Sequence, residues 1–226
     1  MISKDFKRRR DFLLRKIEDN SIVVLFSGLE KSRNNDVNYK FRQSSNFFYL
    51  TGINDPSMLL IITKTGNRHS TTLVCDRPND IDKIWHGQLP SKSSYKNQFE
   101  IQNVLYFDEL RSLELNDARN IYFEFADENR LNEFISNLNL SQPQSRYLRN
   151  NTSRSTKIDL SNLIFDMRRI KSKSEVSLIR HAAKISAKAH INIMKSCKSG
   201  LKEYEVEADF IKHCMSERCE QAYPAI

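Results

Sequence analysis

Histidine and cysteine side chains are the first candidates for chemistry, because they bind metal ions and act as nucleophiles or bases. The 226-residue chain has five histidines and four cysteines. His213, Cys214 and Cys219 lie close together in the sequence and would suggest a zinc site. Their spacing matches no common zinc motif, however, and no fourth ligand is evident. Ordinary helix positions are therefore the favoured interpretation of these three residues.

The remaining histidines give no stronger signal. His181 and His190 are expected on one helix, where a rise of 1.5 Å per residue separates them by about 13 Å, too far to share a metal ion. His190 falls on the apolar side of that helix, which favours a histidine packed in the core. The sequence has no His-Glu-x-x-His motif, no glycine-rich phosphate loop and no Gly-x-Ser-x-Gly motif. The residues alone therefore indicate no catalytic side chain and no metal ligand.

Short apolar runs and turn residues alternate along the first 170 residues. The pattern predicts helices over 3–20, 81–85, 127–138 and 158–170, and strands over 22–26, 47–50, 57–65, 70–75, 104–107 and 121–125. The sequence Thr65-Gly66-Asn67 predicts a hairpin turn, and the polar residues 31–39 predict a loop. Strands interleaved with helices predict an α/β domain with a mixed β-sheet flanked by helices.

The chain changes character after a polar stretch at 141–157, which is expected near a domain boundary. Ser172 and Glu175 predict a capping box for a helix that runs to about Lys198, and Gly200 is expected to stop it. A second helix is expected around 204–215. The first of these helices has an apolar face formed by Val176, Ile179, Ala183, Ala187, His190, Met194 and Cys197.

Composition narrows the classes of function. The net charge is +8, but the basic residues are scattered, apart from short runs at 7–10 and 168–173, and aromatic residues do not interleave with them. This favours a solvated basic surface and no nucleic-acid partner over a stacking platform. The apolar runs are far shorter than the roughly 20 residues of a membrane span, and no secretory h-region follows the charged N-terminus. We therefore expect a cytoplasmic protein with reduced cysteines and no membrane partner.

The most informative segment runs from Tyr39 to Pro56 and reads YKFRQSSNFFYLTGINDP. It resembles the signature of the aminopeptidase P N-terminal domain. Four later segments resemble that family in the same order along the chain: Ile84-Trp85-x-Gly87, Asp166-Met167-Arg168-x-Ile170-Lys171-Ser172, Gly200-x-x-Glu203-Tyr204-Glu205-x-Glu207-Ala208, and Tyr223-Pro224-Ala225. The resemblance to Xaa-Pro aminopeptidases therefore covers the whole chain.

The signature residues are expected to have structural roles. Phe47 and Tyr49 are expected in the core of the sheet, and Gly52 is expected to adopt a positive φ. Arg42 and Gln43 are expected to bind loop carbonyl groups. The full set interpreted in this way is Arg42, Gln43, Ser45, Phe47, Tyr49, Gly52 and Pro56.

Trp85 is the one candidate for substrate contact. The resemblance implies that it reaches the active site of a neighbouring subunit, which also implies a homo-oligomer formed through the N-terminal domain. The alternative is a half-buried aromatic residue at the end of a helix. Gln88 and Leu89 depart from the family pattern, because bacterial relatives often carry basic residues there.

The family removes the N-terminal residue that precedes proline in a peptide. As the resemblance implies, its pita-bread catalytic domain holds two metal ions, usually manganese, with two Asp, one His and two Glu, all beyond the position of Ile226. The expected organisation is an aminopeptidase P N-terminal domain over 1–170, followed by the truncated beginning of an α+β pita-bread domain over 171–226. A chain that lacks these ligands is expected to bind no metal and to be inactive by itself.

Several alternatives stay open, of which a nucleic-acid-binding protein is the weakest. The chain is either a fragment of a longer Xaa-Pro aminopeptidase or a stand-alone binding or oligomerisation module derived from one. The two terminal helices with apolar faces favour the fragment. A fragment of a prolidase-like dipeptidase is also compatible with the pattern, although the segment from Tyr39 to Pro56 favours aminopeptidase P.

Overall fold

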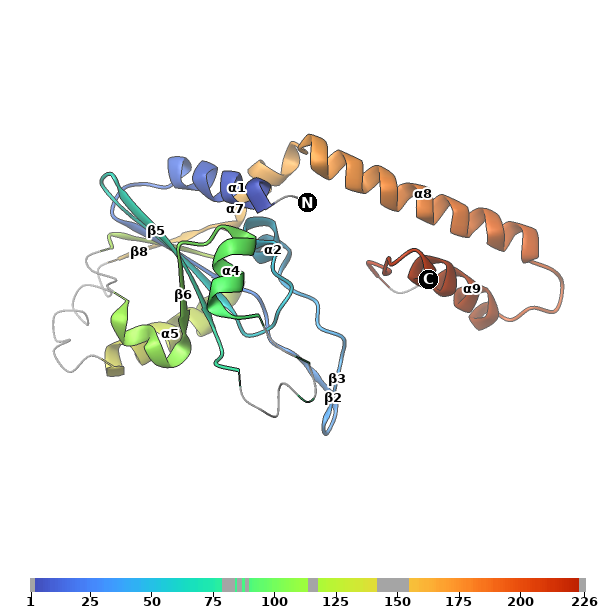
Figure 1. Cartoon of the computed structure of the whole chain (residues 1–226), viewed down its shortest axis with the longest axis horizontal. Coiled ribbons are helices and arrows are strands. Elements are labelled where there is room, and N and C mark those ends of the chain that lie inside the picture. The colour runs from blue at the N-terminus through green and yellow to red at the C-terminus, as the bar shows by residue number, and fades with distance from the viewer. Residues whose placement is uncertain are drawn as a thin grey trace. The chain divides into compact units, whose positions relative to one another are not determined.

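The structure is a computed structural model that describes residues 3–78, 84, 87, 90–113, 118–141 and 155–223 (Figure 1). The chain divides into two compact units, Ile2–Arg169 and Ile170–Ile226. The first unit is an α/β sandwich around a mixed sheet, as the sequence predicts. In the described part of the chain, no helix is long and apolar enough to cross a membrane.

Within the described residues, the main sheet of the first unit has six strands in the order β6-β5-β4-β1-β7-β8. Their bounds are β1 (Ser21–Phe26), β4 (Leu59–Thr65), β5 (Arg68–Cys75), β6 (Asn103–Tyr106), β7 (Asn120–Phe123) and β8 (Thr156–Asp159). β4 pairs antiparallel with β1 and with β5, whereas the pairs β1–β7, β7–β8 and β5–β6 are parallel. β1 lies at the centre, and all its residues are buried, as expected for a strand covered on both faces.

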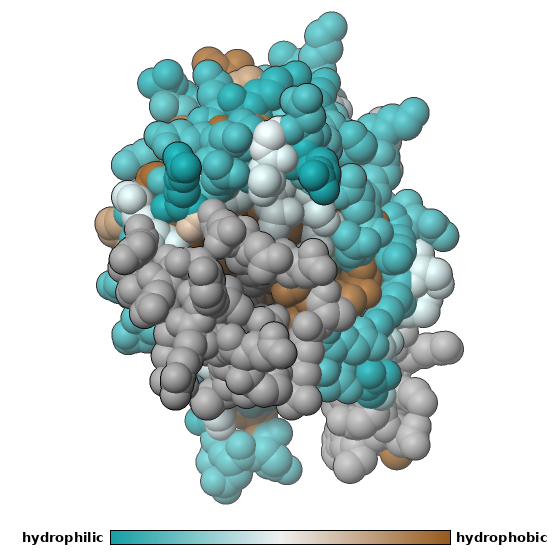
Figure 2. Space-filling model, turned by 90° about the vertical axis from the view of Figure 1, so that its left-hand side faces the viewer, coloured by the Kyte–Doolittle hydropathy of each residue, from teal (hydrophilic) through white to brown (hydrophobic). Residues whose placement is uncertain are grey.

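Helices cover both faces of this sheet. One face carries α1 (Ser3–Lys16), α2 (Ser45–Thr51), α4 (Lys92–Phe99) and α7 (Ser161–Arg169), and the other carries α5 (Glu128–Ser141) with the 3-10 segments η1 (Phe107–Ser112) and η2 (Phe125–Asp127). Alternate residues of β1 enter different cores: Val23 packs with Leu13 of α1, and Val24 packs in the core that contains Leu131 of α5. Figure 2 shows that hydrophilic side chains cover much of one outer face.

Three predicted elements of the first unit differ from the structure. The expected strand 47–50 is wrong, because these residues form helix α2. The expected helix 158–170 begins only at Ser161, because residues 156–159 pair with β7 as β8. The expected loop 31–39 contains a hairpin of β2 (Ser32–Asn34) and β3 (Val37–Asn38). Helix α4 was not expected, and most of the expected helix 81–85 lies outside the described residues.

The second unit contains α8 (Lys173–Ser196) and α9 (Glu203–Ser216). The capping box at Ser172 and Glu175 is confirmed, because each side chain accepts a hydrogen bond from the other residue's backbone N–H. The helix ends at its C-cap Cys197, three residues before Gly200.

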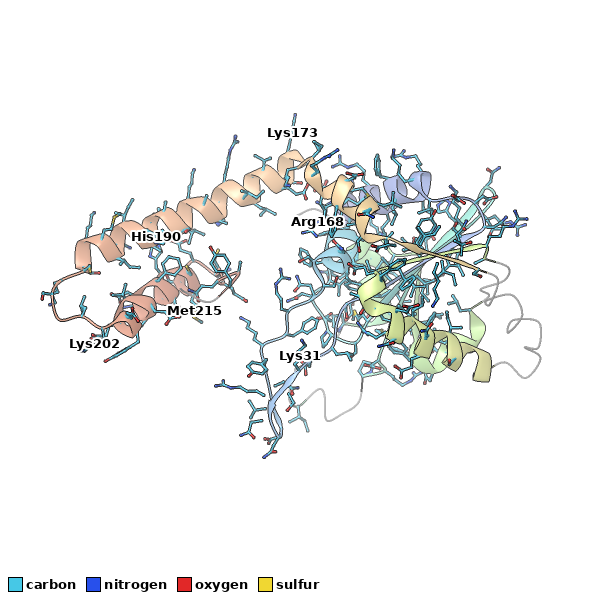
Figure 3. The ribbon with its side chains drawn as sticks, turned by 180° about the vertical axis from the view of Figure 1, so that it is seen from behind. Lys31, Arg168, Lys173, His190, Lys202 and Met215 are labelled. Atoms are coloured by element: carbon cyan, nitrogen blue, oxygen red, sulfur yellow. The ribbon has the colours of Figure 1, made fainter. Side chains whose placement is uncertain are left out.

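The apolar face predicted for α8 is largely exposed. The buried residues are Ile185 and Ala189, whereas Ile179 and Met194 of the expected face are exposed. His190 is exposed and not part of a core, and its ring lies 5.1 Å from that of Phe210 on α9 (Figure 3). The prediction of a core position for His190 is therefore wrong, because periodicity alone does not show which face of a helix is covered.

Candidate functional site

The signature segment folds into the seven-residue helix α2. Ser44 caps its N-terminus, because the serine hydroxyl accepts a hydrogen bond from the backbone N–H of Phe47. Gly52 ends it with φ +76°, and its N–H donates to the carbonyl oxygen of Phe48 at 2.8 Å. Phe47 and Leu50 are fully buried in the core between the helix and the sheet. The positive φ predicted for Gly52 is therefore confirmed.

A polar network joins the N-terminus of α2 to the strand end of β7 and to α7. The carboxylate of Glu124, directly after β7, accepts hydrogen bonds from Asn46 Nδ2 at 2.7 Å and from Ser44 Oγ at 3.4 Å. Arg168 Nη1 donates to Asn46 Oδ1 at 2.6 Å. The buried Asn46 amide therefore links a carboxylate to a guanidinium group. Tyr49 adds a second link to α7, because its hydroxyl donates to the carbonyl oxygen of Met167 at 3.1 Å.

This network lies where the carboxyl ends of the parallel strands β1, β7 and β8 meet. Open α/β sheets commonly bind ligands at such an edge. At this edge of the sheet, hydrogen bonds from Arg168 to Asn46 and from Tyr49 to Met167 join α2 to α7. These polar groups therefore connect helices of the fold. Burial raises the pKa of Glu124, and the hydrogen bonds from Asn46 and Ser44 oppose that shift. The network is suited to fixing the position of α7, the last helix before the second unit.

The raised pKa of Glu124 predicts that the stability of the folded protein depends on pH. The folded protein holds a proton on Glu124 more tightly than the unfolded chain, so stability is lost as pH rises from the ordinary glutamate pKa of 4.5 through the folded pKa. A glutamine keeps an oxygen that can accept from Asn46 Nδ2 but does not ionise. We expect Glu124→Gln to gain stability relative to wild type between pH 4.5 and pH 7, by at most about 1 kcal/mol because the side chain is partly solvated. Urea unfolding of both proteins across this pH range measures the difference, and a pH-independent difference would contradict the assignment.

Two arginines fasten α1 to α2. Arg10 Nη1 donates to Leu50 O at 2.8 Å, and Arg10 Nη2 donates to Phe99 O at 2.9 Å and to Glu100 O at 2.8 Å. Arg9 Nη1 donates to Tyr49 O at 2.9 Å, and its guanidinium carbon lies 4.1 Å from the centre of the Tyr49 ring. Each guanidinium group thus binds carbonyl groups near the C-terminus of a helix, where positive charge is favourable.

The sequence interpretation missed Arg9 and Arg10, because it assigned the basic run at 7–10 to the solvated surface. That assignment is wrong for these two buried residues. A signal was present: Phe6, Arg10, Leu13 and Ile17 recur at helical spacing, which places Arg10 on the apolar face of α1. Burial lowers the pKa of Arg10 to about 10, so the guanidinium group stays charged at neutral pH.

A second polar cluster lies at the ends of β5 and β6. The Tyr95 hydroxyl donates to Asp55 Oδ2 at 2.8 Å, and burial raises the pKa of this phenol. Burial also raises the pKa of Cys75 to about 11, which keeps its thiol protonated at neutral pH. The Arg77 guanidinium carbon and the Lys92 ammonium nitrogen lie 4.3 and 4.1 Å from the centre of the Tyr106 ring. These pKa directions make neither Tyr95 nor Cys75 a ready nucleophile or base.

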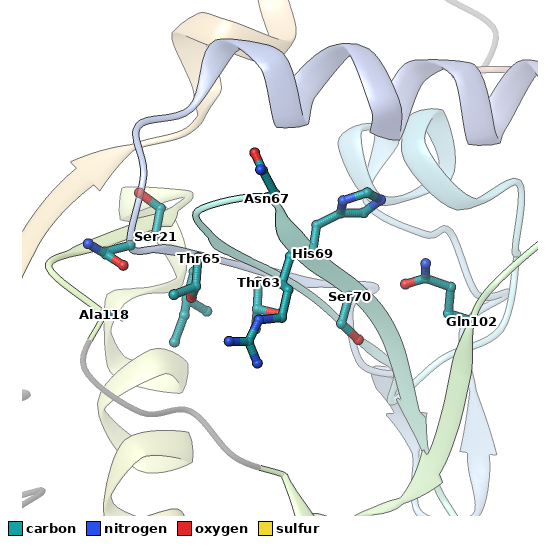
Figure 4. A pocket seen from close by; sticks show the side chains of 11 residues that line it. Ser21, Thr63, Thr65, Asn67, His69, Ser70, Gln102 and Ala118 are labelled. Atoms are coloured by element: carbon teal, nitrogen blue, oxygen red, sulfur yellow. The ribbon is translucent and has the colours of Figure 1, made fainter.

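A polar hollow of about 640 Å³ lies beside the β4–β5 hairpin (Figure 4). Its labelled lining residues are Ser21, Thr63, Thr65, Asn67, His69, Ser70, Gln102 and Ala118. Two of these groups are already bonded to residues outside the lining: Gln102 Oε1 accepts from the backbone N–H of Thr71, and Ser70 Oγ accepts from Asn103 Nδ2. Among the described residues that line the hollow, none carries a carboxylate or a thiol.

Residues 6–122 match the family model described as "Aminopeptidase P, N-terminal domain". The chain belongs to this family. The match includes α2, the central strand β1 and most of α1. Arg9, Arg10 and Asn46 lie within the match, whereas Glu124 and Arg168, the side-chain partners of Asn46, lie beyond it.

Curated relatives extend the similarity beyond the family model. The Xaa-Pro aminopeptidase of Escherichia coli (strain K12) is 28% identical over 209 residues, which are 91% of this chain and 47% of the relative. The human Xaa-Pro dipeptidase is 30% identical over 202 residues, which are 88% of this chain and 39% of the relative. The chain therefore spans less than half the length of these relatives.

Solved structures show the same fold. Proline aminopeptidase P II from Yersinia pestis superposes with a TM-score of 0.84 at 26% identity, over 96% of this chain and 50% of that one. Aminopeptidase P from E. coli in its low-pH form superposes with a TM-score of 0.86 at 24% identity. The mixed sheet flanked by helices is therefore the fold of these aminopeptidase P structures.

The signature residues of the aminopeptidase P domain occupy varied positions. Arg42 is exposed, and its guanidinium donates to the carbonyl of the adjacent Gln43 at 3.2 Å. Ser45 is exposed on the first turn of α2, and Pro56 is half-buried before β4. Phe47 and Tyr49 are buried, although on a helix and not on a strand. The family signature missed Glu124, because that partner of Asn46 is 78 residues away in the sequence.

The metal centre that the family implies does not fit the described residues. Among them, no group of three or more His, Cys, Asp or Glu side chains could hold a metal ion. His213 Nδ1 lies 3.3 Å from Asn192 Nδ2 on α8, while Cys214 is buried. We therefore derive no catalytic step through a metal ion from these residues.

Trp85 lies outside the described residues, as do Gln88 and Leu89. Next to it, Ile84 is 80% exposed, and Gly87 has a φ of +76°. A substrate contact by Trp85 in a neighbouring subunit therefore stays a prediction.

Proposed function

We propose that this chain forms the N-terminal part of a metal-dependent Xaa-Pro aminopeptidase and does not cleave peptides by itself. The family match over residues 6–122 is the observation that carries this proposal. In the completed enzyme, two metal ions, usually manganese, would supply the hydrolytic chemistry from residues outside the described set. The partners of that enzyme would be peptides with proline in the second position.

We further propose that residues 171–226 begin the catalytic domain. The division of the chain at Arg169 and Ile170 supports this boundary. So do the exposed apolar side chains of the helix pair, which include Leu178, Ile179, Ile191, Met194 and Met215. In this proposal the hydrogen bonds from Arg168 to Asn46 and from Tyr49 to Met167 hold α7 in place. The catalytic domain would continue from the end of this helix.

The resemblance to Xaa-Pro aminopeptidases also supports proposals for the oligomeric state of the protein and for its cellular location. We propose a homo-oligomer formed through the N-terminal domain, with Trp85 contacting substrate in a neighbouring subunit. We also propose a cytoplasmic protein, because four cysteines without a paired framework suit a reducing compartment.

A second candidate is a part of an Xaa-Pro dipeptidase. The 30% identity to the human Xaa-Pro dipeptidase favours it. The two activities differ in substrate length, because a dipeptidase needs a free carboxylate directly after proline. A dipeptide and a longer peptide with the same first two residues therefore distinguish them.

The test uses this chain alone and a chimaera. The chimaera joins the chain to the part of the E. coli Xaa-Pro aminopeptidase that lies beyond the matched region. Both are incubated with manganese and either an Xaa-Pro peptide or its Xaa-Ala counterpart. We expect no turnover by the chain alone and Xaa-Pro-specific cleavage by the chimaera.

Two results would count against the proposal. Manganese-dependent turnover by the pure chain would show that it holds a complete active site. A chimaera that is folded by circular dichroism but inactive would show that this domain does not support aminopeptidase chemistry.

A further inference from the structure

The turn that ends helix α9 brings two cysteines together. Directly after the C-cap Glu217, Arg218 has a left-handed backbone with φ +58°. The N–H of Cys219 donates to the carbonyl oxygen of Cys214 at 2.9 Å. The N–H of Arg218 donates to the carbonyl oxygen of Met215 at 3.0 Å. Two such hydrogen bonds around a left-handed residue form a Schellman motif, in which Cys214 and Cys219 are the two outermost residues.

This motif holds the two cysteines at a separation that a disulfide bond can span. Fixed covalent bond lengths and the 2.9 Å hydrogen bond limit the distance between their Cα atoms to about 7 Å at most. Bridged cysteines have Cα atoms about 4.4–6.8 Å apart. Side chains at these two positions of a Schellman motif commonly contact each other. Cys214 is 7% exposed and Cys219 is half-buried, as such a contact requires, and both thiols are free.

The other two cysteines do not compete for this pairing. Cys75 is buried in the core of the first unit. Cys197 is the C-cap of α8, beside the loop that joins α8 to α9 (Figure 1). Cys214 lies about 16 Å along the axis of α9 from Glu203, the first residue of that helix, at a rise of 1.5 Å per residue. Cys197 and Cys214 are therefore at opposite ends of α9.

We propose that Cys214 and Cys219 form a reversible oxidation site that a small-molecule disulfide, such as oxidised glutathione, converts into an intramolecular disulfide. The thiolate of Cys219, the less buried of the two, attacks one sulfur of oxidised glutathione, and one glutathione leaves. Cys214 then loses its proton, and its sulfur attacks Cys219 Sγ and releases the second glutathione. The two cysteines give up two electrons and two protons, which the two departing glutathione molecules carry away.

The site suits a response to oxidation and not a permanent cross-link. In a reducing compartment both thiols stay free, and disulfides of cytosolic proteins are mostly transient. The left-handed backbone of Arg218 is unfavourable for a residue other than glycine, so the reduced turn is held against strain by its two hydrogen bonds. A disulfide would close this turn covalently. Oxidation would therefore fix the direction in which the chain leaves α9.

The test titrates the whole chain with mixtures of reduced and oxidised glutathione. Samples are quenched with acid, unfolded and alkylated, and the number of alkylated thiols is read from the mass of the intact protein. We expect the wild-type chain to change from four alkylated thiols to two. Trypsin cleaves after Lys212 and Arg218, so the oxidised chain should give peptide 213–218 joined to the peptide that begins at Cys219. Reduction should separate the two peptides.

Two substitutions of Arg218 test whether the turn geometry promotes the disulfide. Both Arg218→Pro and Arg218→Gly remove the same charge, but only glycine can adopt the left-handed backbone. We expect R218P to lower the equilibrium constant for disulfide formation at least about tenfold, because both hydrogen bonds of the motif are lost. R218G should oxidise at least as readily as wild type. Circular dichroism of the reduced proteins should show the same helix content in both.

Two cysteine variants complete the set. Cys197→Ser removes the exposed cysteine at the end of α8 and should leave the titration curve unchanged apart from the loss of one alkylated thiol. Cys214→Ser removes the attacking thiol of the second step, so the reaction should stop at the mixed disulfide of Cys219 with glutathione. Intact mass distinguishes this product, because the protein then carries one added glutathione.

The proposal is overturned if the wild-type chain keeps four alkylated thiols in oxidised glutathione, or if R218P oxidises as readily as R218G. A tryptic cross-link that contains Cys197 in place of Cys214 or Cys219 would also overturn it. None of these measurements involves peptide cleavage, so failure of this proposal and failure of the peptidase proposal are distinguishable.

Discussion

Replacing Arg10 with methionine is expected to destabilise the first unit by about 3–5 kcal/mol, the usual range for removing one partner of a buried charged network. Arg10 is 2% exposed, and its guanidinium satisfies the carbonyl oxygens of Leu50, Phe99 and Glu100. Methionine fills part of the volume but donates no hydrogen bond. Three carbonyl groups near the ends of α2 and α4 would lose their donor, and unsatisfied buried acceptors are costly.

Urea unfolding of Arg10→Met beside Arg8→Met measures this effect. The Arg8 side chain is 68% exposed and pairs with Asp5 one turn away, so its loss should cost no more than about 0.5 kcal/mol. Arg10→Lys should fall between the two, because one ammonium group cannot match the planar fork that spans two helices. A cost below about 1 kcal/mol for Arg10→Met would show that water replaces the guanidinium group.

Gly52→Ala is expected to be nearly as damaging, at about 3 kcal/mol or more. The residue has φ +76°, which costs an alanine about 1 kcal/mol. A Cβ atom there would also lie 2.3 Å from Cε2 of the Phe6 ring, with two more ring atoms within 2.8 Å. The ring must move out of its buried position, and exposing it forfeits roughly 1.5–3 kcal/mol.

Gly66→Ala is the matched control. Gly66 has a similar φ of +57°, but a Cβ atom at this position would meet nothing within 4 Å, so only the backbone cost applies. The difference in unfolding free energy between the two variants measures the collision with Phe6. Phe6→Ala should lower the added cost of Gly52→Ala, because the colliding ring is gone. Equal effects of the two glycine substitutions would contradict the close contact between α1 and α2.

The parts of the fold that depend on local signals could be predicted from the sequence. β1 is a short β-branched run, and Gly66 marks the β4–β5 turn, so both appeared at the expected places. The helix α2 could not be distinguished from a strand, because its aromatic residues suit both. Its state is decided by the cap at Ser44 and by contacts with α1 and α7. Those contacts join residues far apart in the sequence, which a local pattern does not report.

The candidate site was predictable only in part. The signature directed attention to Tyr49 and Gly52, and both make the contacts that hold α2 in place. Glu124 has no distinguishing neighbours in the sequence, so its link to Asn46 emerges only from the folded sheet. Arg10 was assigned to the surface because basic runs are usually solvated, although its spacing within α1 placed it among apolar residues.

Helix α2 bonds both to α1, near the start of the first unit, and to α7, at its end. During synthesis, α1 and α2 can meet early, but Met167 and Arg168 become available only when nearly the whole unit has been translated. Contacts between residues so far apart close slowly and late. During translation, the signature helix would therefore be held on one side only until α7 emerges from the ribosome. The first unit can then finish folding before the residues after Arg169 have folded.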